Sequence, residues 1–222
     1  MTIHLRPATD LAERVLLPGD PHRALAVAQA MLEQPKMFNH HRGLWGYTGT
    51  ARDGAPLSVQ STGMGGPSAA IVCEELVMLG ARTLIRIGTC GALDAGLSIG
   101  DLVAVDNALA LDGTSRALGA DTEVSPDPDL TARMDAPAVT AASVDVFYGN
   151  PDTGNAAVVE MESATIFQVA KLRGIRAAAV LGVSDVLQDG QRTRIEQEAL
   201  EQLGLRLGEA AWAALEKLKA KS

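Results

Sequence analysis

The sequence predicts an α/β fold, in which a mixed, mainly parallel central sheet is flanked by helices. The first observation is length, because 222 residues suffice for one such domain with a sizeable core, here residues 1–222. The second is pattern: short β-rich runs alternate with amphipathic helical stretches. This alternation is typical of parallel strands that are joined by helices packed on the faces of the sheet.

The first half of the chain supplies three strands and two helices. We expect strands at residues 14–17, 57–61 and 83–87, and they alternate with helices at 21–32 and 68–79. A proline opens the first helix, where its missing N–H is harmless, and a glycine follows the second helix. Each strand is therefore followed by a helix or by a glycine-rich turn.

The second half repeats the pattern after an irregular stretch. Residues 112–135 carry glycine, proline and aspartate without a clear period, which predicts loops around one short helix. A helix at 162–172 ends at Gly174, and a strand at 176–183 follows. The last long helix is expected at 193–219.

Composition excludes several classes of protein. The net charge of -8 argues against a general nucleic-acid binder. No apolar run approaches the roughly 18 residues of a membrane span, and no signal peptide is evident, so we expect a cytoplasmic protein that does not bind a membrane. Cys73 and Cys90 are expected to be free thiols, and no His/Cys cluster has metal-ligand spacing.

Four predicted strands end in polar or glycine-rich clusters. These clusters are Gly19-Asp20, Gly63-Met64-Gly65, Gly88-Thr89 and Ser184-Asp185. In open α/β sheets, ligands bind beyond the carboxyl ends of the strands. We therefore expect the four clusters to converge on one pocket.

Arg86 is the strongest single candidate for ligand binding. It lies inside a strand that is otherwise apolar, and arginine is rarely fully buried without a partner. The partner is either a structural salt bridge or an anionic ligand, for which Gly88 and Thr89 offer close backbone approach and a hydroxyl. The turn at 19–23 precedes a helix and favours an anion too, although an ordinary tight turn has the same residues. Arg42 alone is more typical of a solvated turn.

Acidic and aromatic residues form the second group of candidates. Glu160 and Glu162 point to the same side if their segment is extended, and paired carboxylates suit adjacent ribose hydroxyls. The alternative is that they merely end a strand and open a helix. Asp185 follows an apolar strand, so it is either a general acid or a turn residue. Phe147 and Tyr148 either stack on a base or simply pack.

Taken together, these segments resemble the nucleoside phosphorylase family, which contains bacterial purine nucleoside phosphorylases and uridine phosphorylases. Seven segments match in family order: LPGDPHR (17–23), RGLWGYTG (42–49), GMGGPS (63–68), RIGTCG (86–91), SVDVFY (143–148), EME (160–162) and SD (184–185). The resemblance spans nearly the whole chain. It implies a nucleoside phosphorylase-like fold, with a nucleoside and inorganic phosphate as the substrates and no cofactor or metal.

The resemblance also implies a role for each matching residue. Phosphate would be held by Gly19, Arg23, Arg86 and Thr89, together with Arg42 of a neighbouring subunit. Ribose would be held by Met64, Glu160, Met161 and Glu162, with the neighbour's His4 at the 5′-hydroxyl. The base would meet Cys90, Gly91, Phe147, Val159 and Ser184. Asp185 would protonate N7 of a purine, supported by Arg192 or Arg194. Sites shared in this way imply a homo-oligomer, in the family a hexamer built as a trimer of dimers.

The choice of base rests on a few segments. The segment 143–148, the acid at Asp185 and the short stretch between Tyr148 and Val158 favour purines, because uridine phosphorylases carry a longer insertion there. Residues 63–71 and 111–115 look closer to uridine phosphorylases, and the arginine that follows the acid is not at the purine-family spacing. The prediction is phosphorolysis of purine (deoxy)ribonucleosides, with uridine phosphorylase as the alternative. A nucleosidase and a non-catalytic nucleoside-binding protein are weaker alternatives, since the first needs no arginine-lined anion site.

Overall fold

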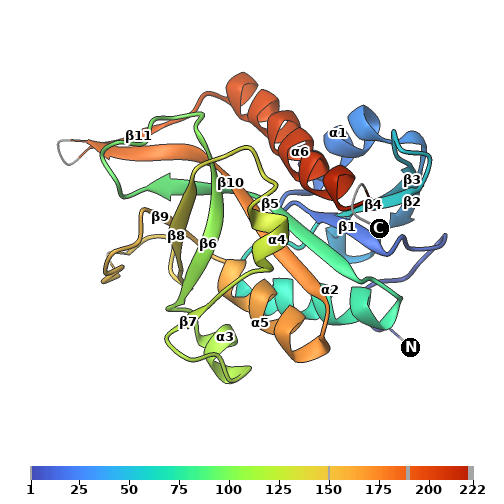
Figure 1. The fold of residues 1–222 in the computed structure, drawn as a ribbon, viewed down its shortest axis with the longest axis horizontal. Coiled ribbons are helices and arrows are strands. Elements are labelled where there is room, and N and C mark those ends of the chain that lie inside the picture. Colours follow the sequence, from blue (N-terminus) through green and yellow to red (C-terminus); the bar gives the residue numbers. More distant parts are fainter. Residues whose placement is uncertain (1, 150, 189–190, 220–222) are drawn as a thin grey trace.

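The computed structural model, which describes residues 2–149, 151–188 and 191–219, has a central sheet with helices on both faces (Figure 1). Helices α1 (Pro21–Met31) and α6 (Gln197–Lys219) cover one face. Helices α2 (Gly66–Met78) and α5 (Ser163–Arg173) cover the other. This arrangement confirms the predicted α/β class with a mixed sheet flanked by helices.

Four mutually parallel strands form the centre of the sheet. They lie in the order β4 (Pro56–Gln60), β1 (Arg14–Leu17), β5 (Thr83–Ala92) and β10 (Arg176–Gln188). Their carboxyl ends consequently point in one direction, as the strand-end clusters require. The antiparallel strands β2 (Glu33–Asn39) and β3 (Gly46–Thr50) extend the sheet beyond β4.

On the other side, the sheet curls round and closes on itself. Strand β10 also pairs with β6 (Leu102–Ala110), which pairs with β8 (Ala138–Ser143). Strand β8 pairs with β9 (Val158–Glu160), and β9 returns to β5. The ring β5–β10–β6–β8–β9 thereby brings the end of β9 next to the end of β5. Closure also removes free edges from these strands.

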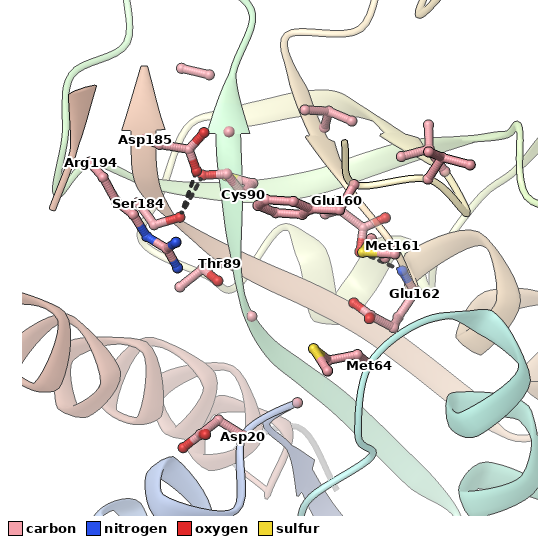
Figure 2. A pocket seen from close by; sticks show the side chains of 18 of the residues that line it. Asp20, Met64, Thr89, Cys90, Glu160, Met161, Glu162, Ser184, Asp185 and Arg194 are labelled. Atoms are coloured by element: carbon pink, nitrogen blue, oxygen red, sulfur yellow. Dashed lines mark hydrogen bonds between the residues drawn. The ribbon is translucent and has the colours of Figure 1, made fainter. Parts of the chain in front are cut away.

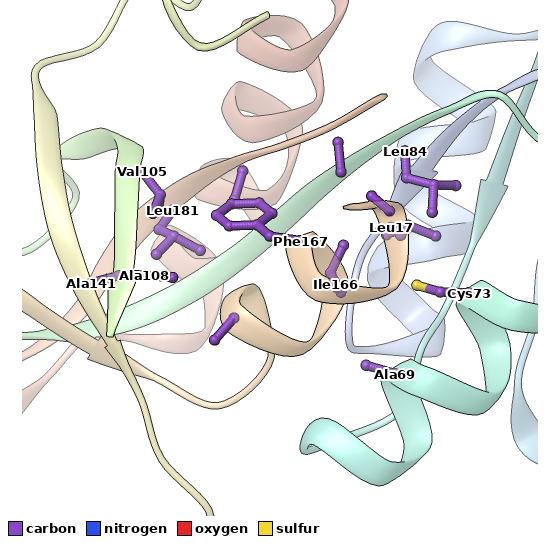
Figure 3. Close-up of a cluster of buried hydrophobic side chains, with 14 of the residues drawn as sticks. Leu17, Ala69, Cys73, Leu84, Val105, Ala108, Ala141, Ile166, Phe167 and Leu181 are labelled. Carbon is purple, nitrogen blue, oxygen red and sulfur yellow. The ribbon is translucent and has the colours of Figure 1, made fainter. Parts of the chain in front are cut away.

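Alternating side chains on the central strands build two cores. On β1, Val15 and Leu17 face the α2/α5 layer, whereas Leu16 faces the α1/α6 layer. This period of two is the geometry of a strand that is buried on both faces. Figure 3 shows the α2/α5 core, where Leu181 of the sheet lies near Phe167 of α5, and Leu84 lies on the side of Leu17.

Local signals in the sequence set the helix ends. The Asp20 side chain caps α1 by accepting a hydrogen bond from the Arg23 N–H at 2.7 Å, and Pro21 occupies the first turn. Gly174 ends α5 in the left-handed conformation, with φ of 63°. Helices α1, α2 and α5 follow strands β1, β4 and β9, respectively, after short connections.

Two strands are longer than the sequence predicts. Strand β5 continues past Ile87 to Ala92, and β10 continues past Val183 to Gln188. Glycine, serine and aspartate in these extensions look like turn residues. They remain extended because β5 and β10 pair with each other as far as Ala92 and Val186, with a bulge between Val183 and Asp185. The last two residues of β10 pair with β11 (Gln191–Arg194).

Two further expectations are wrong. The last helix begins at Gln197 and not at residue 193, because Gln191–Arg194 forms strand β11, antiparallel to β10. The stretch 112–135 holds two short helices, α3 (Gly113–Ala117) and α4 (Pro128–Thr131), with the short strand β7 (Glu123–Val124) between them. The side chains of Asp112 and Asp127 cap the N-termini of these two helices. Such capping residues indicate where a helix begins, but here they lie among many other turn-forming residues.

We predict that Gly182→Ala destabilises the fold, because Gly182 lets α6 approach β10 closely. A Cβ atom at this position would lie 2.7 Å from Cδ2 of the buried Leu203. Overpacking of this kind costs roughly 1–3 kcal/mol. Urea unfolding should show this loss, whereas Gly96→Ala in an exposed turn should change stability little. Equal stability of the two variants would contradict the packing described here.

Candidate active site

A pocket of about 590 Å³ lies where the strand ends meet (Figure 2). Its wall includes Gly19 after β1, Gly63 after β4, Thr89 on β5 and Asp185 on β10. The four clusters that were expected to converge therefore do so. Glu160, at the end of β9, lies in the wall of the pocket opposite Asp185.

Nearly all the candidate residues line this one pocket. They are Gly19, Arg23, Met64, Arg86, Thr89, Cys90, Gly91, Phe147, Val159, Glu160, Met161, Glu162, Ser184, Asp185, Arg192 and Arg194. His4 and Arg42 do not line it. The sixteen come from segments spread over most of the sequence, so their common location is a result of the sheet topology.

Arg86 is buried between two carboxylates. Its Nε lies 3.0 Å from Oε2 of Glu160, and its Nη2 lies 2.6 Å from Oε2 of Glu162. Burial acts to lower the pKa of Arg86, but the charges of Glu162 and Glu160 outweigh it, so the pKa is raised above its ordinary value. Arg86 therefore has the structural ion pairs that were one of its two explanations. It also lines the pocket, and binding of an anionic ligand there stays a prediction.

The two carboxylates are held by backbone groups at helix N-termini. Glu160 accepts hydrogen bonds from the N–H groups of Glu162 at 2.9 Å and Ser163 at 2.9 Å, where α5 begins. Glu162 accepts one from the N–H of Gly65, just before α2. Helix N-termini favour negative charge, which offsets part of the cost of burial. Burial nevertheless raises the pKa of Glu162, although Arg86 acts against this.

The segment of the two glutamates is only partly extended. Strand β9 ends at Glu160, and Glu162 is the N-cap residue of α5. The two side chains converge because both reach Arg86, and not because an extended strand puts them on one face. Figure 2 shows Glu160, Met161 and Glu162 together on one side of the pocket, with Met64 close to Glu162.

Arg23 and Arg86 together make the pocket attractive to an anion. Burial lowers the pKa of Arg23, Asp20 acts against this, and the like charge of Arg86 lowers the pKa further. Arg23 belongs to the first turn of α1, whose N-terminus also faces the pocket. An anion that binds between two guanidinium groups and a helix N-terminus relieves their mutual repulsion.

Gly88 gives the Arg86 guanidinium its place. A Cβ atom at position 88 would lie 2.5 Å from Cζ of Arg86 and 2.6 Å from its Nη2. Any side chain at this position would therefore displace a buried, ion-paired group. From the sequence, we expected Gly88 to let a ligand approach the backbone closely. In the structure, Gly88 leaves room for the guanidinium group of Arg86.

Asp185 sits on the opposite wall, beside the bulge in β10. The Ser184 hydroxyl donates to Oδ2 of Asp185 at 3.1 Å or to the carbonyl of Cys90 at 3.2 Å. A Cβ atom at Gly91 would lie 3.1 Å from Oδ1 of Asp185, so the glycine leaves room for the carboxylate. Asp185 is 8% exposed, and its carboxyl group faces the pocket.

The structure distinguishes the two arginines of β11. Arg194 is the direct cross-strand neighbour of Asp185, yet the ion pair comes from Arg192, whose Nε lies 3.2 Å from Oδ1 of Asp185. The guanidinium of Arg192 also lies 5.3 Å from the centre of the Phe147 ring. Phe147 in turn makes an edge contact with Tyr148. Arg192 thereby connects the acid to the aromatic part of the pocket.

His4 and Arg42 lie together outside the pocket. The backbone carbonyl of His4 is 3.0 Å from Nδ1 of His41, which is adjacent to Arg42. Arg42 is exposed and has a left-handed backbone, with φ of 61°. Two residues that are distant in sequence therefore share one surface region.

The structure also reveals a contact that sequence reasoning missed. The hydroxyl of Ser143 donates to Oε1 of Glu160, and it accepts a hydrogen bond from the N–H of Ala164 at 2.9 Å. Ser143 is opposite Glu160 in the β8–β9 register. The sequence contains no local signal for this pairing, because it depends on closure of the strand ring.

The described residues contain neither a cluster of metal ligands nor a helix with the character of a membrane span. No group of three or more His, Cys, Asp or Glu side chains within the described part of the chain is arranged to hold a metal ion. None of the helices formed by those residues has the length and apolar character of a membrane span. Cys73 and Cys90 are both free and buried, as expected, and burial raises the pKa of each thiol.

The relatives of this chain among known proteins agree with one another in family and in name. The family model described as the Phosphorylase superfamily matches residues 13–217. A purine nucleoside phosphorylase DeoD-type from Roseobacter denitrificans is 38% identical over 213 residues, which are 86% of this chain and 90% of that protein. Proteins of the same name from Geobacillus kaustophilus and Clostridium beijerinckii are 34% and 37% identical, each over 90% of this chain and 92% of the relative.

We predict that Arg86→Met is strongly destabilising at neutral pH. It leaves Glu160 and Glu162 buried without their cation, which costs roughly 3–5 kcal/mol. Buried carboxylates without a cation have pKa values above those of the unfolded chain, so the loss should be largest near pH 7 and shrink towards pH 5. Urea unfolding at both pH values measures it.

The matched control is Arg173→Met, which removes an exposed arginine paired with Glu74. A surface pair of this kind contributes little to stability, because water and salt screen it. Equal losses of stability in the two variants would contradict the buried ion pairs of Arg86 with Glu160 and Glu162. A loss for Arg86→Met that is independent of pH would contradict them too.

Proposed function

This chain belongs to the Phosphorylase superfamily, and from that membership we propose that it is a purine nucleoside phosphorylase. The reaction is phosphorolysis of a purine ribonucleoside or deoxyribonucleoside to the free base and the pentose 1-phosphate. One observation carries the proposal: a single pocket joins a guanidinium pair, a carboxylate pair and a separate acid, Asp185. These are the groups that phosphate, ribose and a purine require.

The phosphate half of the site is proposed around Arg86. Gly19, Arg23 and Thr89 surround the same part of the pocket, and the N-terminus of α1 adds a partial positive charge. Inorganic phosphate is the proposed co-substrate, and we assign no other cofactor. Because Arg86 also contacts Glu160 and Glu162, phosphate and ribose come to lie next to each other.

The ribose half is proposed at the glutamate pair. Carboxylate oxygens accept hydrogen bonds from the 2′- and 3′-hydroxyls, with Met64 and Met161 against the sugar. Breaking the glycosidic bond leaves positive charge on the ribose ring. A phosphate anion held beside C1′ stabilises this charge and then forms the new C1′–O bond.

Asp185 is proposed to assist departure of the base. When the C1′–N9 bond breaks, its electron pair passes to the purine, and a proton on N7 makes the purine a better leaving group. Protonated Asp185 donates that proton, while Arg192 stabilises the carboxylate that results. Cys90, Gly91, Phe147, Val159 and Ser184 line the adjacent part of the pocket, where the base is proposed to lie.

His4 and Arg42 are proposed to complete a neighbouring copy's pocket. Both lie in one surface region away from their own pocket, so a single contact between two copies would deliver both. The proposed assembly is a homo-oligomer, and we favour a hexamer built as a trimer of dimers. A cytoplasmic location is part of the same proposal.

A test of the function is release of hypoxanthine from inosine with and without phosphate. We expect release only when phosphate is present, because the arginines hold the attacking nucleophile. Equal rates in both conditions would indicate a nucleosidase and overturn the proposal. Release of uracil from uridine without action on inosine would identify a uridine phosphorylase, and binding without any turnover would identify a nucleoside-binding protein.

A second prediction concerns the acid and its arginine. Asp185→Asn should lower kcat on inosine by about 10²–10⁴, the usual contribution of a general acid, while nucleoside binding persists. Arg192→Gln should lower kcat by about tenfold, because it removes the cation that is paired with Asp185. The matched variant is Arg194→Gln on the same strand. Steady-state kinetics should show a smaller loss of kcat for Arg194→Gln than for Arg192→Gln. A larger loss for Arg194→Gln would reverse the assignment.

A further inference from the structure

Glu75 is a buried carboxylate that lies outside the pocket. It belongs to α2 and holds the N-terminal segment of the chain: its oxygens accept hydrogen bonds from the backbone N–H groups of Ile3 at 3.0 Å, His4 at 3.0 Å and Leu5 at 2.6 Å. The ring of His4 adds a fourth contact, with Nδ1 at 2.8 Å from Oε1 of Glu75. Four donors thus converge on one side chain.

Glu75 is ionised at neutral pH. Burial acts to raise its pKa, but the hydrogen bonds from Leu5, His4 and Ile3 outweigh it and lower the pKa to about 2. An ionised carboxylate has only acceptors to offer. The Nδ1 atom of His4 must therefore carry the hydrogen in this contact.

The contact decides what the other ring nitrogen can do. In a neutral imidazole with hydrogen on Nδ1, Nε2 carries a lone pair and is an acceptor. The His4 side chain is 30% exposed, so one part of the ring is open while Nδ1 faces Glu75. Two further contacts hold the surrounding backbone. Nδ1 of His41 contacts the carbonyl of His4, and the Thr2 hydroxyl donates to the carbonyl of Leu5.

We propose that Glu75 is a positioning residue that fixes His4 with hydrogen on Nδ1 and presents Nε2 as a hydrogen-bond acceptor to the 5′-hydroxyl of a nucleoside in a neighbouring copy. This inference rests on the proposed function, in which His4 serves a neighbour's pocket. A 5′-hydroxyl has one hydrogen to donate as well as two lone pairs, and it donates that hydrogen to such an acceptor. A nucleoside without this hydroxyl leaves the acceptor unsatisfied and is disfavoured.

The amide variant Glu75→Gln alters this arrangement with little change of shape. An amide has one acceptor oxygen and an NH₂ donor in place of two acceptor oxygens. The NH₂ group can donate to Nδ1, which then allows hydrogen on Nε2 and turns the acceptor into a donor. With the NH₂ group at the Oε1 position beside Nδ1, the N–H groups of His4 and Leu5 keep the amide oxygen as an acceptor, whereas the N–H of Ile3 loses its acceptor.

The first experiment needs no variant. ¹⁵N NMR of the intact, histidine-labelled protein at pH 8 reports which nitrogen of each ring carries hydrogen, and His4→Ala identifies the His4 signals. We expect hydrogen on Nδ1 of His4. Hydrogen on Nε2 would overturn the proposal, whether or not the protein splits inosine.

The second experiment compares inosine with 5′-deoxyinosine in steady-state kinetics. For the unaltered protein, we expect a higher KM for the deoxy substrate. Glu75→Gln should raise the KM for inosine roughly three- to tenfold, the range for one lost hydrogen bond, with kcat little changed and little effect on 5′-deoxyinosine. Glu74→Gln, which alters the neighbouring carboxylate that pairs with Arg173, is the matched control and should leave both substrates unaffected.

A double variant separates positioning from general stability. In the His4→Ala background, Glu75→Gln should add no further increase in the KM for inosine. A further increase of the same size there, or an equal effect on both substrates, would overturn the role of Glu75. Failure of the proposed function is distinguishable, because it would abolish phosphate-dependent cleavage of both substrates without changing the hydrogen position in the ¹⁵N spectrum.

Discussion

The buried ion pairs of Arg86 with Glu160 and Glu162 are the interaction on which the rest of the site depends. A guanidinium inside a parallel strand is costly unless anions accompany it, and the two glutamates supply them. They reach it only because the strand ring closes and brings the end of β9 beside β5. The helix N-termini at Gly65 and Ser163 then stabilise the carboxylates in turn.

This arrangement also explains how one pocket accommodates groups of opposite charge. The proposed anion site lies at Arg86 and Arg23, and the glutamates proposed to bind the ribose hydroxyls are the ion-pair partners of Arg86. Asp185 is separated from this cluster across the pocket and has its own cation in Arg192. The proton transfer proposed for Asp185 would therefore take place away from the ion pairs of Arg86. The chemistry proposed for the chain follows from this separation.

Much of this was predictable from the sequence where the signals are local. The first strand and helix follow from Asp20 and Pro21, and the convergence of strand ends follows from parallel topology. Long-range pairing was not predictable. The extension of β10 past Ser184 depends on β5, the Ser143–Glu160 contact depends on the β8–β9 register, and the choice of Arg192 over Arg194 depends on side-chain reach across β11. Glu75 gave no signal either, because a glutamate on a helix is ordinarily solvated.

Phosphate bound beside Arg86 is proposed to be the nucleophile that receives the pentose. ³¹P NMR during cleavage of inosine in phosphate buffer tests it directly, because the phosphorus resonance moves when the C1′–O bond forms. We expect a sugar phosphate resonance to appear in step with free hypoxanthine, while inorganic phosphate falls by the same amount. Hypoxanthine that accumulates while inorganic phosphate remains the only phosphorus species would contradict it.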